Sequence, residues 1–294
     1  MPSAELKRAG PPASARPADV LPRLACPTCV RPLGADLTCA KCGATYSEAR
    51  TVVDLRPAGL GDRFDVRDWT EHWSDDKQDT FAQRFFSFYR KAVFARTVRH
   101  FVDGYLPRQG VLVEAGSGTS ETSMRIRKDA GRTLVALDLI GAVLEHCHPV
   151  MDVRMAGDIM RMPFLDDSVD GIWNVGVMEH FTHDVIDQML REFRRVLRPG
   201  GRLVLLWPGT DSPPQKLLRL IERIANSRGR QPPLRFHPDE ISQLHSVAEG
   251  RAVLERNGFD MVAADAGPRS LFAFKIVVGQ KRVDTQFNGT RGEA

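Results

Sequence analysis

The chain has 294 residues, of which 42% are hydrophobic, and a formal net charge of +4 at pH 7. This length accommodates one full α/β core and a small additional segment, but the charge is too small to indicate nucleic-acid binding by itself. Apolar runs such as 203–207 and 271–274 fall far short of the roughly 20 residues that cross a bilayer. The Pro- and Ala-rich residues 1–22 lack the continuous apolar block of a secretory signal. We therefore expect a disordered tail over 1–22, no membrane partner and a cytoplasmic location.

Four of the five cysteines form two C-x-x-C pairs, with nine residues between the pairs. The dense clustering of these four and the odd total of five suit metal ligation in a reducing compartment better than disulfides. Two such pairs supply the four thiolates of a closed tetrahedral zinc site, which leaves no open position for catalysis, so the zinc is expected to be structural. The predicted ligands are Cys26, Cys29, Cys39 and Cys42.

The cysteine pairs and their surroundings resemble the zinc ribbon at the start of some bacterial methyltransferases, including the 23S ribosomal RNA guanine methyltransferase family, and the small Trm112-like zinc proteins. The resemblance is carried by residues 24–29, 37–46 and 52–55. It implies a zinc ribbon over 23–56 that gains its folding energy from the metal, and it implies no particular substrate.

A linker and a helical cap are predicted over 57–104. Gly and Asp residues occur through 57–68, and apolar side chains then recur at roughly helical spacing in a segment without Gly or Pro. These side chains are Phe81, Phe85, Phe88, Val93, Phe94, Val98 and Phe101. Their aromatic rings form either ordinary helix packing or the lid of a substrate pocket.

From 105 to 280 short β-branched or Leu-rich runs alternate with helical patterns, which is typical of βαβ units and a parallel sheet with helices on both faces. Strands are predicted at 111–113, 134–137, 169–174, 203–207, 261–264 and 271–278, and helices at 184–197, 215–227 and 251–257. Pro199-Gly200-Gly201 is expected to end the first of these helices. An insertion or lid is predicted at about 208–250 and a tail at 281–294.

Residues 111–120 read as a strand that runs into a glycine loop. Gly116 and Gly118 let the backbone approach a ligand closely, and Asp138, twenty residues after Gly118, can accept hydrogen bonds from two ribose hydroxyls. Dinucleotide enzymes place a third glycine where this chain has Glu121, whose charge would oppose a pyrophosphate. The pattern therefore favours a cofactor without phosphates.

This loop and the residues after it resemble the class I S-adenosylmethionine-dependent methyltransferases, well over about 105–207 and loosely over 251–280. The motifs are E-x-G-x-G at 114–118, the ribose acid Asp138, Gly157-Asp158-Ile159, and two stretches of the ubiquinone/menaquinone-biosynthesis type at 169–180 and 190–206. Ser120 replaces a glycine that is frequent in the family, so we expect a slightly altered loop that still binds.

The resemblance implies a Rossmann-like, seven-stranded methyltransferase sheet and S-adenosyl-L-methionine as the cofactor. Taken singly, Asp138 could be a strand-end turn residue and Asp158 a helix cap. The glycine loop and the two acids together, in this order and spacing, favour a cofactor site. The implied cofactor-binding residues are Glu114, Gly116, Ser117, Gly118, Asp138, Leu139, Asp158, Ile159 and Asn174.

Methyl transfer from a sulfonium is an in-line displacement, which depends on orientation and exclusion of water more than on catalytic groups. A neutral oxygen or nitrogen nucleophile can still need its proton removed, and a histidine after the fourth strand is suited to this. His180 is the first catalytic candidate, followed by Glu179 and then His183. Alternatively, His180 only shapes the pocket or hydrogen-bonds the start of the next helix.

Three functions remain open at this point. A small-molecule acceptor, enclosed by the aromatic helices and the insertion, is favoured by the aromatic side chains and the quinone-type motifs. An RNA acceptor would use the ribbon and the basic insertion. The third function, a non-catalytic zinc-ribbon interaction protein, is disfavoured by the intact cofactor motifs. The basic residues of the insertion are Lys216, Arg219, Arg223, Arg228, Arg230 and Arg235.

Overall fold

The computed structural model describes residues 19–49, 51–57, 90–208, 213–227, 241–270 and 272–283. Most of the predicted linker, the aromatic residues Phe81, Phe85 and Phe88, most of both predicted tails and parts of the insertion lie outside these ranges. Within the described ranges, no helix is both long and apolar enough to cross a membrane.

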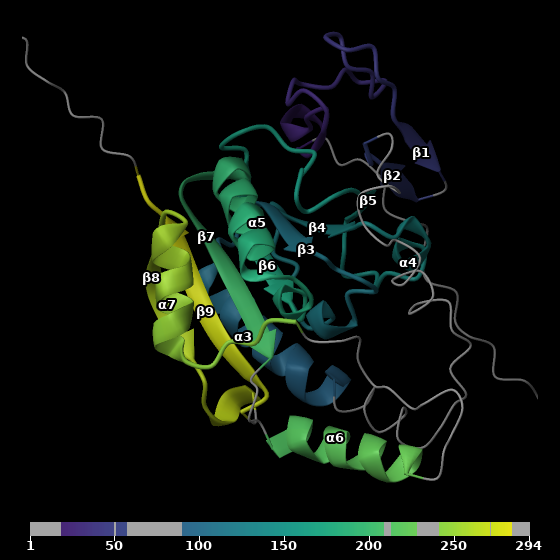
Figure 1. Cartoon of the computed structure of the whole chain (residues 1–294). Coiled ribbons are helices and arrows are strands. Elements are labelled where there is room, and N and C mark those ends of the chain that lie inside the picture. The colour runs from purple at the N-terminus through teal and green to yellow at the C-terminus, as the bar shows by residue number, and fades with distance from the viewer. Residues whose placement is uncertain are drawn as a thin grey trace, which may run out of the picture.

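The centre of the molecule is a nine-stranded sheet with the order β1-β2-β5-β4-β3-β6-β7-β9-β8 (Figure 1). Strands β2 to β7 run parallel along this order, and the outer pairs β1·β2, β7·β9 and β9·β8 are antiparallel. The strands are β1 (Ser47–Ala49), β2 (Val52–Asp54), β3 (Gly110–Ala115), β4 (Arg132–Asp138), β5 (Val153–Ala156), β6 (Val169–Val175), β7 (Leu197–Pro208), β8 (Phe259–Asp265) and β9 (Phe274–Lys281). The seven strands from β5 to β8 confirm the predicted Rossmann-like methyltransferase sheet.

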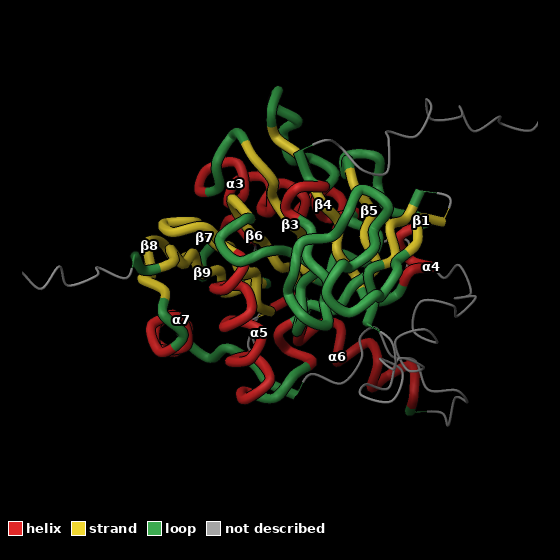
Figure 2. Tube along the Cα trace, turned by 90° about the horizontal axis from the view of Figure 1, so that it is seen from above, coloured by secondary structure: helices red, strands yellow, loops and turns green. Residues whose placement is uncertain are grey.

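Two hydrophobic cores lie on the two faces of this sheet. One is formed with α5 (His183–Val196), α7 (Val247–Arg256) and the cysteine segment, residues 23–46, and the other with α3 (Ala95–Tyr105) and α4 (Gly141–Leu144). Figure 2 shows α3 on one side of the strands and α5 and α7 on the other. The predicted arrangement of helices on both faces is therefore confirmed.

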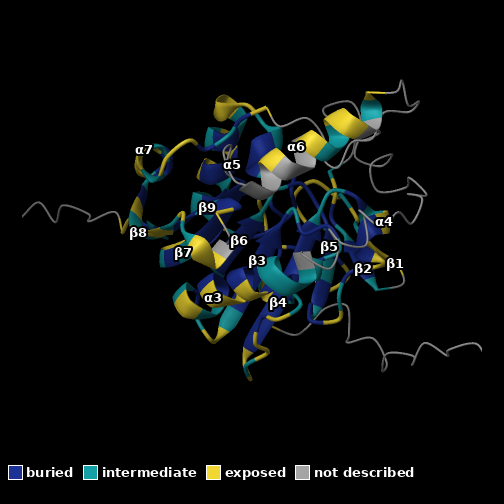
Figure 3. Ribbon diagram, turned by 90° about the horizontal axis from the view of Figure 1, so that it is seen from below, coloured by how far each residue is buried: buried dark blue, intermediate teal, exposed yellow. Residues whose placement is uncertain are grey.

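The sequence pattern explains which side chains of each element are buried. In β3, Val111 and Val113 join the core under α5, and Leu112 between them joins the core under α3. Because both faces of such a strand are buried, it appears in the sequence as a continuous apolar run. Helix α5 buries the side chains Ile186, Met189, Leu190, Phe193 and Val196, which recur at three- and four-residue spacing on one side of the helix. The middle strands in Figure 3 are accordingly buried, whereas α6 (Pro213–Asn226) carries exposed residues.

The structure adds one feature to the predicted sheet and changes another. Strand β2, which follows the cysteine segment, pairs with β5, so that Val52 and Val53 belong to the two opposite cores. Pro199-Gly200-Gly201 does more than end a helix. Helix α5 ends at Val196, and these residues lie within β7 at a register shift opposite Val169 and Gly171, with a φ of 71° at Gly200.

Asp170, in β6, connects three segments at the amino end of the parallel strands. One carboxylate oxygen accepts hydrogen bonds from the Arg23 Nη1 at 2.7 Å and from the Val111 backbone N–H at 2.8 Å. The other oxygen lies 3.2 Å from the Arg198 Nε. Gly110 has a φ of 93°, and a Cβ added there would overlap the Asp170 carboxylate. This acid therefore fixes the cysteine segment to the start of β3.

Replacing Asp170 by Ala should lower the free energy of unfolding by about 2 kcal/mol, because the buried Val111 N–H would lose its acceptor. Urea denaturation measures this change. The matched control is Asp260→Ala, which removes an exposed ion pair with Arg282 and should change stability by no more than about 0.5 kcal/mol. Equal effects of the two substitutions would contradict the role given to Asp170.

Candidate cofactor and metal sites

The glycine loop, residues 116–120, follows β3 at the carboxyl edge of the sheet. Gly116, Gly118 and Ser120 all have positive φ values, at 72°, 50° and 55°. A Cβ added at Gly116 would lie 2.7 Å from Val177 Cγ2, so only glycine fits there. The Gly116 and Ser117 N–H groups donate to the Leu137 carbonyl oxygen at 2.9 and 3.1 Å. Ser120 thus adopts the conformation that a glycine takes most readily.

Asp138, the last residue of β4, holds the glycine loop in place. Its Oδ2 accepts a hydrogen bond from the Gly118 N–H at 2.8 Å and its Oδ1 accepts one from the Ile140 N–H at 2.9 Å. Burial raises the pKa of Asp138, and these two N–H groups oppose that rise. Each carboxylate oxygen can accept a further hydrogen bond, and the half-buried Asp138 and Leu139 remain accessible at this edge.

Asp158 lies on the neighbouring strand end, beyond β5. Its Oδ1 accepts a hydrogen bond from the Met160 N–H at 2.8 Å, and the Gly157 N–H donates to the Asp138 carbonyl oxygen at 2.9 Å. Asp158 is buried and Ile159 is half-buried. Both predicted acids therefore stand at the same edge of the sheet as the glycine loop.

Asn174 and Glu114 each present a buried oxygen that has no hydrogen-bond partner in the described part of the chain. The Asn174 Nδ2 donates to the Ala115 carbonyl oxygen at 2.6 Å, which leaves Oδ1 available as an acceptor. The Glu114 Oε1 accepts a hydrogen bond from the Ser123 Oγ at 2.7 Å, and its Oε2 is the unpaired atom. Unpaired buried acceptors are costly, so these atoms are candidates for hydrogen bonds from a ligand.

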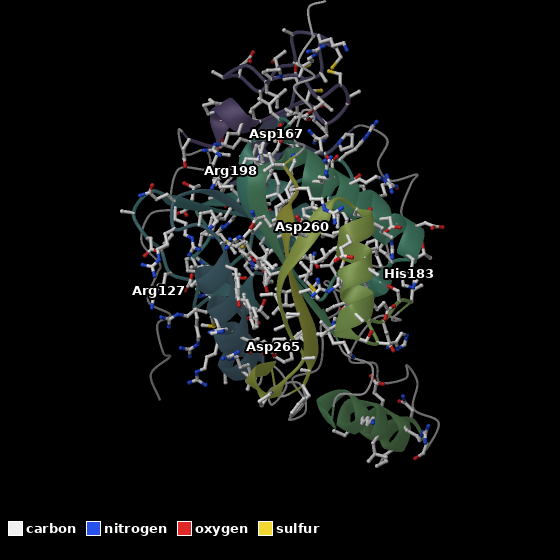
Figure 4. All side chains as sticks on the ribbon, turned by 90° about the vertical axis from the view of Figure 1, so that its left-hand side faces the viewer. Arg127, Asp167, His183, Arg198, Asp260 and Asp265 are labelled. Carbon is white, nitrogen blue, oxygen red and sulfur yellow. The ribbon has the colours of Figure 1, made fainter. Side chains whose placement is uncertain are left out.

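Glu179 and His180 lie in the short helical turn η5 (Met178–His180) that follows β6. Glu179 is 5% exposed, and the His180 side chain is 10% exposed, with its Nε2 3.6 Å from the Glu179 Oε1. The Ile241 and Ser242 N–H groups donate to the Glu179 carbonyl oxygen at 2.6 and 3.0 Å. The structure brings these two candidates together beside the glycine loop, whereas His183 lies on the surface at the start of α5 (Figure 4).

The sequence analysis did not identify the segment around Cys147 and His148 as a support of the glycine loop. The Cys147 thiol lies 3.4 Å from the Ser120 Oγ, and the His148 N–H donates to the Thr119 carbonyl oxygen at 2.8 Å. These residues follow the short helix α4, whose four residues carry no readable periodicity. Only the tertiary structure shows that Cys147 belongs to the surroundings of this loop.

The four cysteines converge, with all their Sγ atoms within 4.8 Å of one another. Cys26 and Cys42 are 3.6 Å apart and Cys29 and Cys39 are 3.4 Å apart. A tetrahedral zinc site with Zn–S bonds of about 2.3 Å has sulfur separations of about 3.8 Å. The cluster therefore has dimensions close to those of such a site.

The two cysteine loops repeat the same backbone geometry. The Val30 N–H donates to the Cys26 carbonyl oxygen at 2.8 Å, and the Gly43 N–H donates to the Cys39 carbonyl oxygen at 2.8 Å. Val30 and Gly43 both have positive φ values, at 52° and 72°. The repetition explains how two C-x-x-C pairs present their thiols to one point.

Burial raises the pKa of Glu114 from 4.5 to about 7. Between these pH values the folded protein holds a proton that the unfolded chain releases, so stability should fall as pH rises from about 4.5 to 7. Glu114→Gln mimics the protonated form and should lack this fall, so that the ligand-free variant is more stable at pH 8 by up to about 3 kcal/mol. Urea denaturation at pH 5.5 and pH 8 tests this, with the exposed Glu255→Gln as the control. A slope with pH that is identical in the variant and the wild type would disprove the prediction.

Part of the chain that holds this geometry is similar to known methyltransferases. Residues 113–205 match the model of a methyltransferase domain. The Mycolicibacterium smegmatis protein named "probable S-adenosylmethionine-dependent methyltransferase" is 32% identical over 154 residues, 51% of this chain and 52% of that protein. The demethylmenaquinone methyltransferase of Mycobacterium marinum is 29% identical over 165 residues, 50% of this chain and 69% of that protein. The chain thus spans about half the length of the first of these relatives.

A solved structure shows the same fold. The magnesium protoporphyrin IX methyltransferase of Synechocystis, determined with bound S-adenosylhomocysteine, aligns with a TM-score of 0.50 at 16% identity, over 74% of this chain and 94% of that one. This likeness concerns the fold, and the sequence matches concern the segment that holds the glycine loop and both acids. The chain therefore carries a class I, Rossmann-like S-adenosylmethionine-dependent methyltransferase domain.

Proposed function

We propose that the chain transfers a methyl group from S-adenosylmethionine to an oxygen, nitrogen or carbon nucleophile of a small-molecule metabolite. The observation that carries the proposal is the burial of Glu179 and His180 in a turn beside the glycine loop, covered by the backbone of Ile241 and Ser242. An enclosed site of this kind suits an acceptor small enough to be separated from water.

The described residues fit the cofactor. Asp138 would accept hydrogen bonds from ribose hydroxyls, and Asp158 would meet the adenine from the neighbouring strand end. The unpaired Asn174 Oδ1 would accept a bond from an N–H donor of the cofactor. Gly116 fits because any side chain there would collide with Val177. When bound, S-adenosylmethionine supplies an electrophilic methyl group on a sulfonium.

His180 would accept the proton that a neutral acceptor loses as its nucleophilic atom bonds to the methyl carbon. In this displacement the carbon–sulfur bond breaks, its electron pair stays on sulfur, and S-adenosylhomocysteine leaves. Glu179, whose Oε1 lies 3.6 Å from the His180 Nε2, would stabilise the imidazolium. A carbon nucleophile or an acid that is already ionised would need only positioning by these residues.

The position of the insertion supports a small acceptor. Strand β7 ends at Pro208, and the chain returns at Ile241 against the turn that holds Glu179, so the insertion begins and ends at the carboxyl edge of the sheet. A relative from M. marinum is named for the acceptor demethylmenaquinone. For the RNA alternative, Lys216 and Arg223 are exposed on α6, whereas Arg228, Arg230 and Arg235 lie outside the described residues.

Incubating the protein with methyl-labelled S-adenosylmethionine and host extract should place the label in the small-molecule fraction. Asp138→Ala should lose most of this activity, because hydrogen bonds to a charged group contribute about 1.5 to 3 kcal/mol and the glycine loop would also lose its anchor. The control Asp260→Ala should retain activity. Label that enters RNA instead, with an activity that falls steeply with salt, would favour the RNA acceptor and refute this proposal.

We also propose that Cys26, Cys29, Cys39 and Cys42 hold one structural zinc ion and that the segment around them is a zinc ribbon. The sulfur separations fit the ion. The segment is joined to the cofactor edge, because the Ala25 N–H donates to the Pro163 carbonyl oxygen at 3.0 Å and Leu24 pairs with Phe164. Metal loading would therefore stabilise the loop that begins at Asp158.

Elemental analysis of protein purified without chelator should return one zinc per chain, and Cys39→Ser should lose it. Because the cysteine segment shares a core with Met160 and Phe164, this variant should also unfold at lower temperature and bind S-adenosylhomocysteine several-fold more weakly. Cys147→Ser, which alters a buried thiol outside the cluster, should keep the metal. Cofactor affinity that is unchanged in Cys39→Ser would mean that the cysteine segment is independent of the catalytic domain.

A further inference from the structure

A cavity of about 390 Å³ is lined in part by α5, and its lining contains none of the predicted cofactor residues. Three parts of the chain line it: the first cysteine loop with Pro27, Thr28 and Val30, the loop of residues 160–162, and one side of α5. Figure 1 shows α5 below the N-terminal segment. None of the residues lining the cavity belongs to the cofactor set, so the methyltransferase activity does not account for this cavity.

The acid in this cavity is already neutralised. Glu192 accepts hydrogen bonds from the Arg195 Nη2 at 2.6 Å, from the Arg195 Nε at 2.9 Å and from the Met162 N–H at 2.7 Å. Arg195 also donates to the Phe164 carbonyl oxygen at 2.9 Å and to Asp166 at 2.7 Å. Glu192 and Arg195 thus form a closed network that fixes the 162–166 loop on α5.

Two further arginines line the cavity without such a partner. Within the described ranges, the guanidinium groups of Arg161 and Arg191 form no hydrogen bond or ion pair, and both residues are exposed. Asp187, one turn before Arg191, is bound by Arg256 at 2.9 Å and by Asn257 at 2.7 Å. Asp187 attracts Arg191 through space, but no acid of the described residues hydrogen-bonds to or forms an ion pair with either of these two arginines.

The remaining lining combines the polar Thr28 and Gln188 with four apolar residues. Pro27, Met160 and Met162 are buried, and Val30 is 40% exposed. A concave site that combines apolar walls with a few charged groups is typical of small-molecule binding, and its volume falls at the lower end of the range for such sites, about 300 to 1,000 Å³. Planar guanidinium groups recognise carboxylate and phosphate oxygens, often with two hydrogen bonds each.

We infer that this cavity binds a small organic anion, whose carboxylate or phosphate lies between Arg161 and Arg191 and whose apolar part packs against Met160 and Met162. The site is separate from the methyl-transfer site. It is linked to that site through Asp158, because the Arg161 N–H donates to the Asp158 carbonyl oxygen at 3.1 Å.

The test uses the full chain with ¹³C-labelled methionine methyl groups and three probes: inorganic phosphate, phenyl phosphate and phenylacetate. Phenyl phosphate or phenylacetate at millimolar concentration should shift the Met160 and Met162 signals and leave Met189, in the core under α5, unchanged. Inorganic phosphate should bind more weakly, because it lacks an apolar part. If no probe shifts Met160 or Met162, the inference is wrong.

The double variant Arg161→Gln/Arg191→Gln should weaken phenyl phosphate binding by about tenfold or more, as expected for the loss of charge-assisted hydrogen bonds. The matched control Arg251→Gln/Arg282→Gln removes two charges from exposed ion pairs outside the cavity and should bind as the wild type does. A thermal unfolding curve confirms that each variant is folded.

If both double variants bound phenyl phosphate equally weakly, the effect would come from the overall charge of the protein, and the inferred site would be wrong. A single-stranded RNA could bind more tightly than the small probes and depend in the same way on Arg161 and Arg191. That result would show that the site binds nucleic acid and would overturn the inference of a small anion. Neither result bears on methyl transfer, because the labelling experiment with Asp138→Ala tests that activity separately.

Discussion

The hydrogen bonds that Asp138 accepts from Gly118 and Ile140 are the interaction on which the candidate cofactor site depends. They join the loop after β3 to the end of β4, and the Gly157 N–H extends the connection to the end of β5 through the Asp138 carbonyl oxygen. One residue therefore fixes three strand ends at the edge where an open α/β sheet binds its ligands. The acid has a structural role even before any ribose is bound, so a mutation at Asp138 changes the loop as well as the contact.

The cysteine segment packs against one face of the sheet and is held there by a shared core. It contributes Leu24, Leu37 and two buried cysteines to the same core as Met155, Phe164 and the apolar side of α5. Its continuation β2 adds a strand beyond β5. A segment of this length has too little apolar surface to fold alone, and here the shared core and a metal could act together. The cysteine segment and the methyltransferase domain are thus expected to unfold as one cooperative unit.

Much of this architecture could be predicted from the sequence, because buried parallel strands give apolar runs and α5 has a clear helical period. The spacing of Gly116, Gly118 and Asp138 likewise placed one loop and one acid at the same edge. Strands β1 and β2 have only three residues each, too few for a pattern to register. The support of Ser120 by Cys147 arises from residues 27 positions apart. No local signal can reveal such a contact, because it exists only once α4 has packed against the sheet.

The two candidate ligand sites differ in the chemical groups that they present. The glycine loop, Asp138 and Asp158 present mainly acceptors and backbone groups, which suit a cofactor that carries hydroxyl and amino groups and a positive sulfonium. Arg161 and Arg191 present only donors and positive charge, which suit an anion. Because Asp158 and Arg161 belong to one turn, a ligand that orders Arg161 would also restrict Asp158. Binding at the two sites would then be coupled, and any coupling would act equally in both directions.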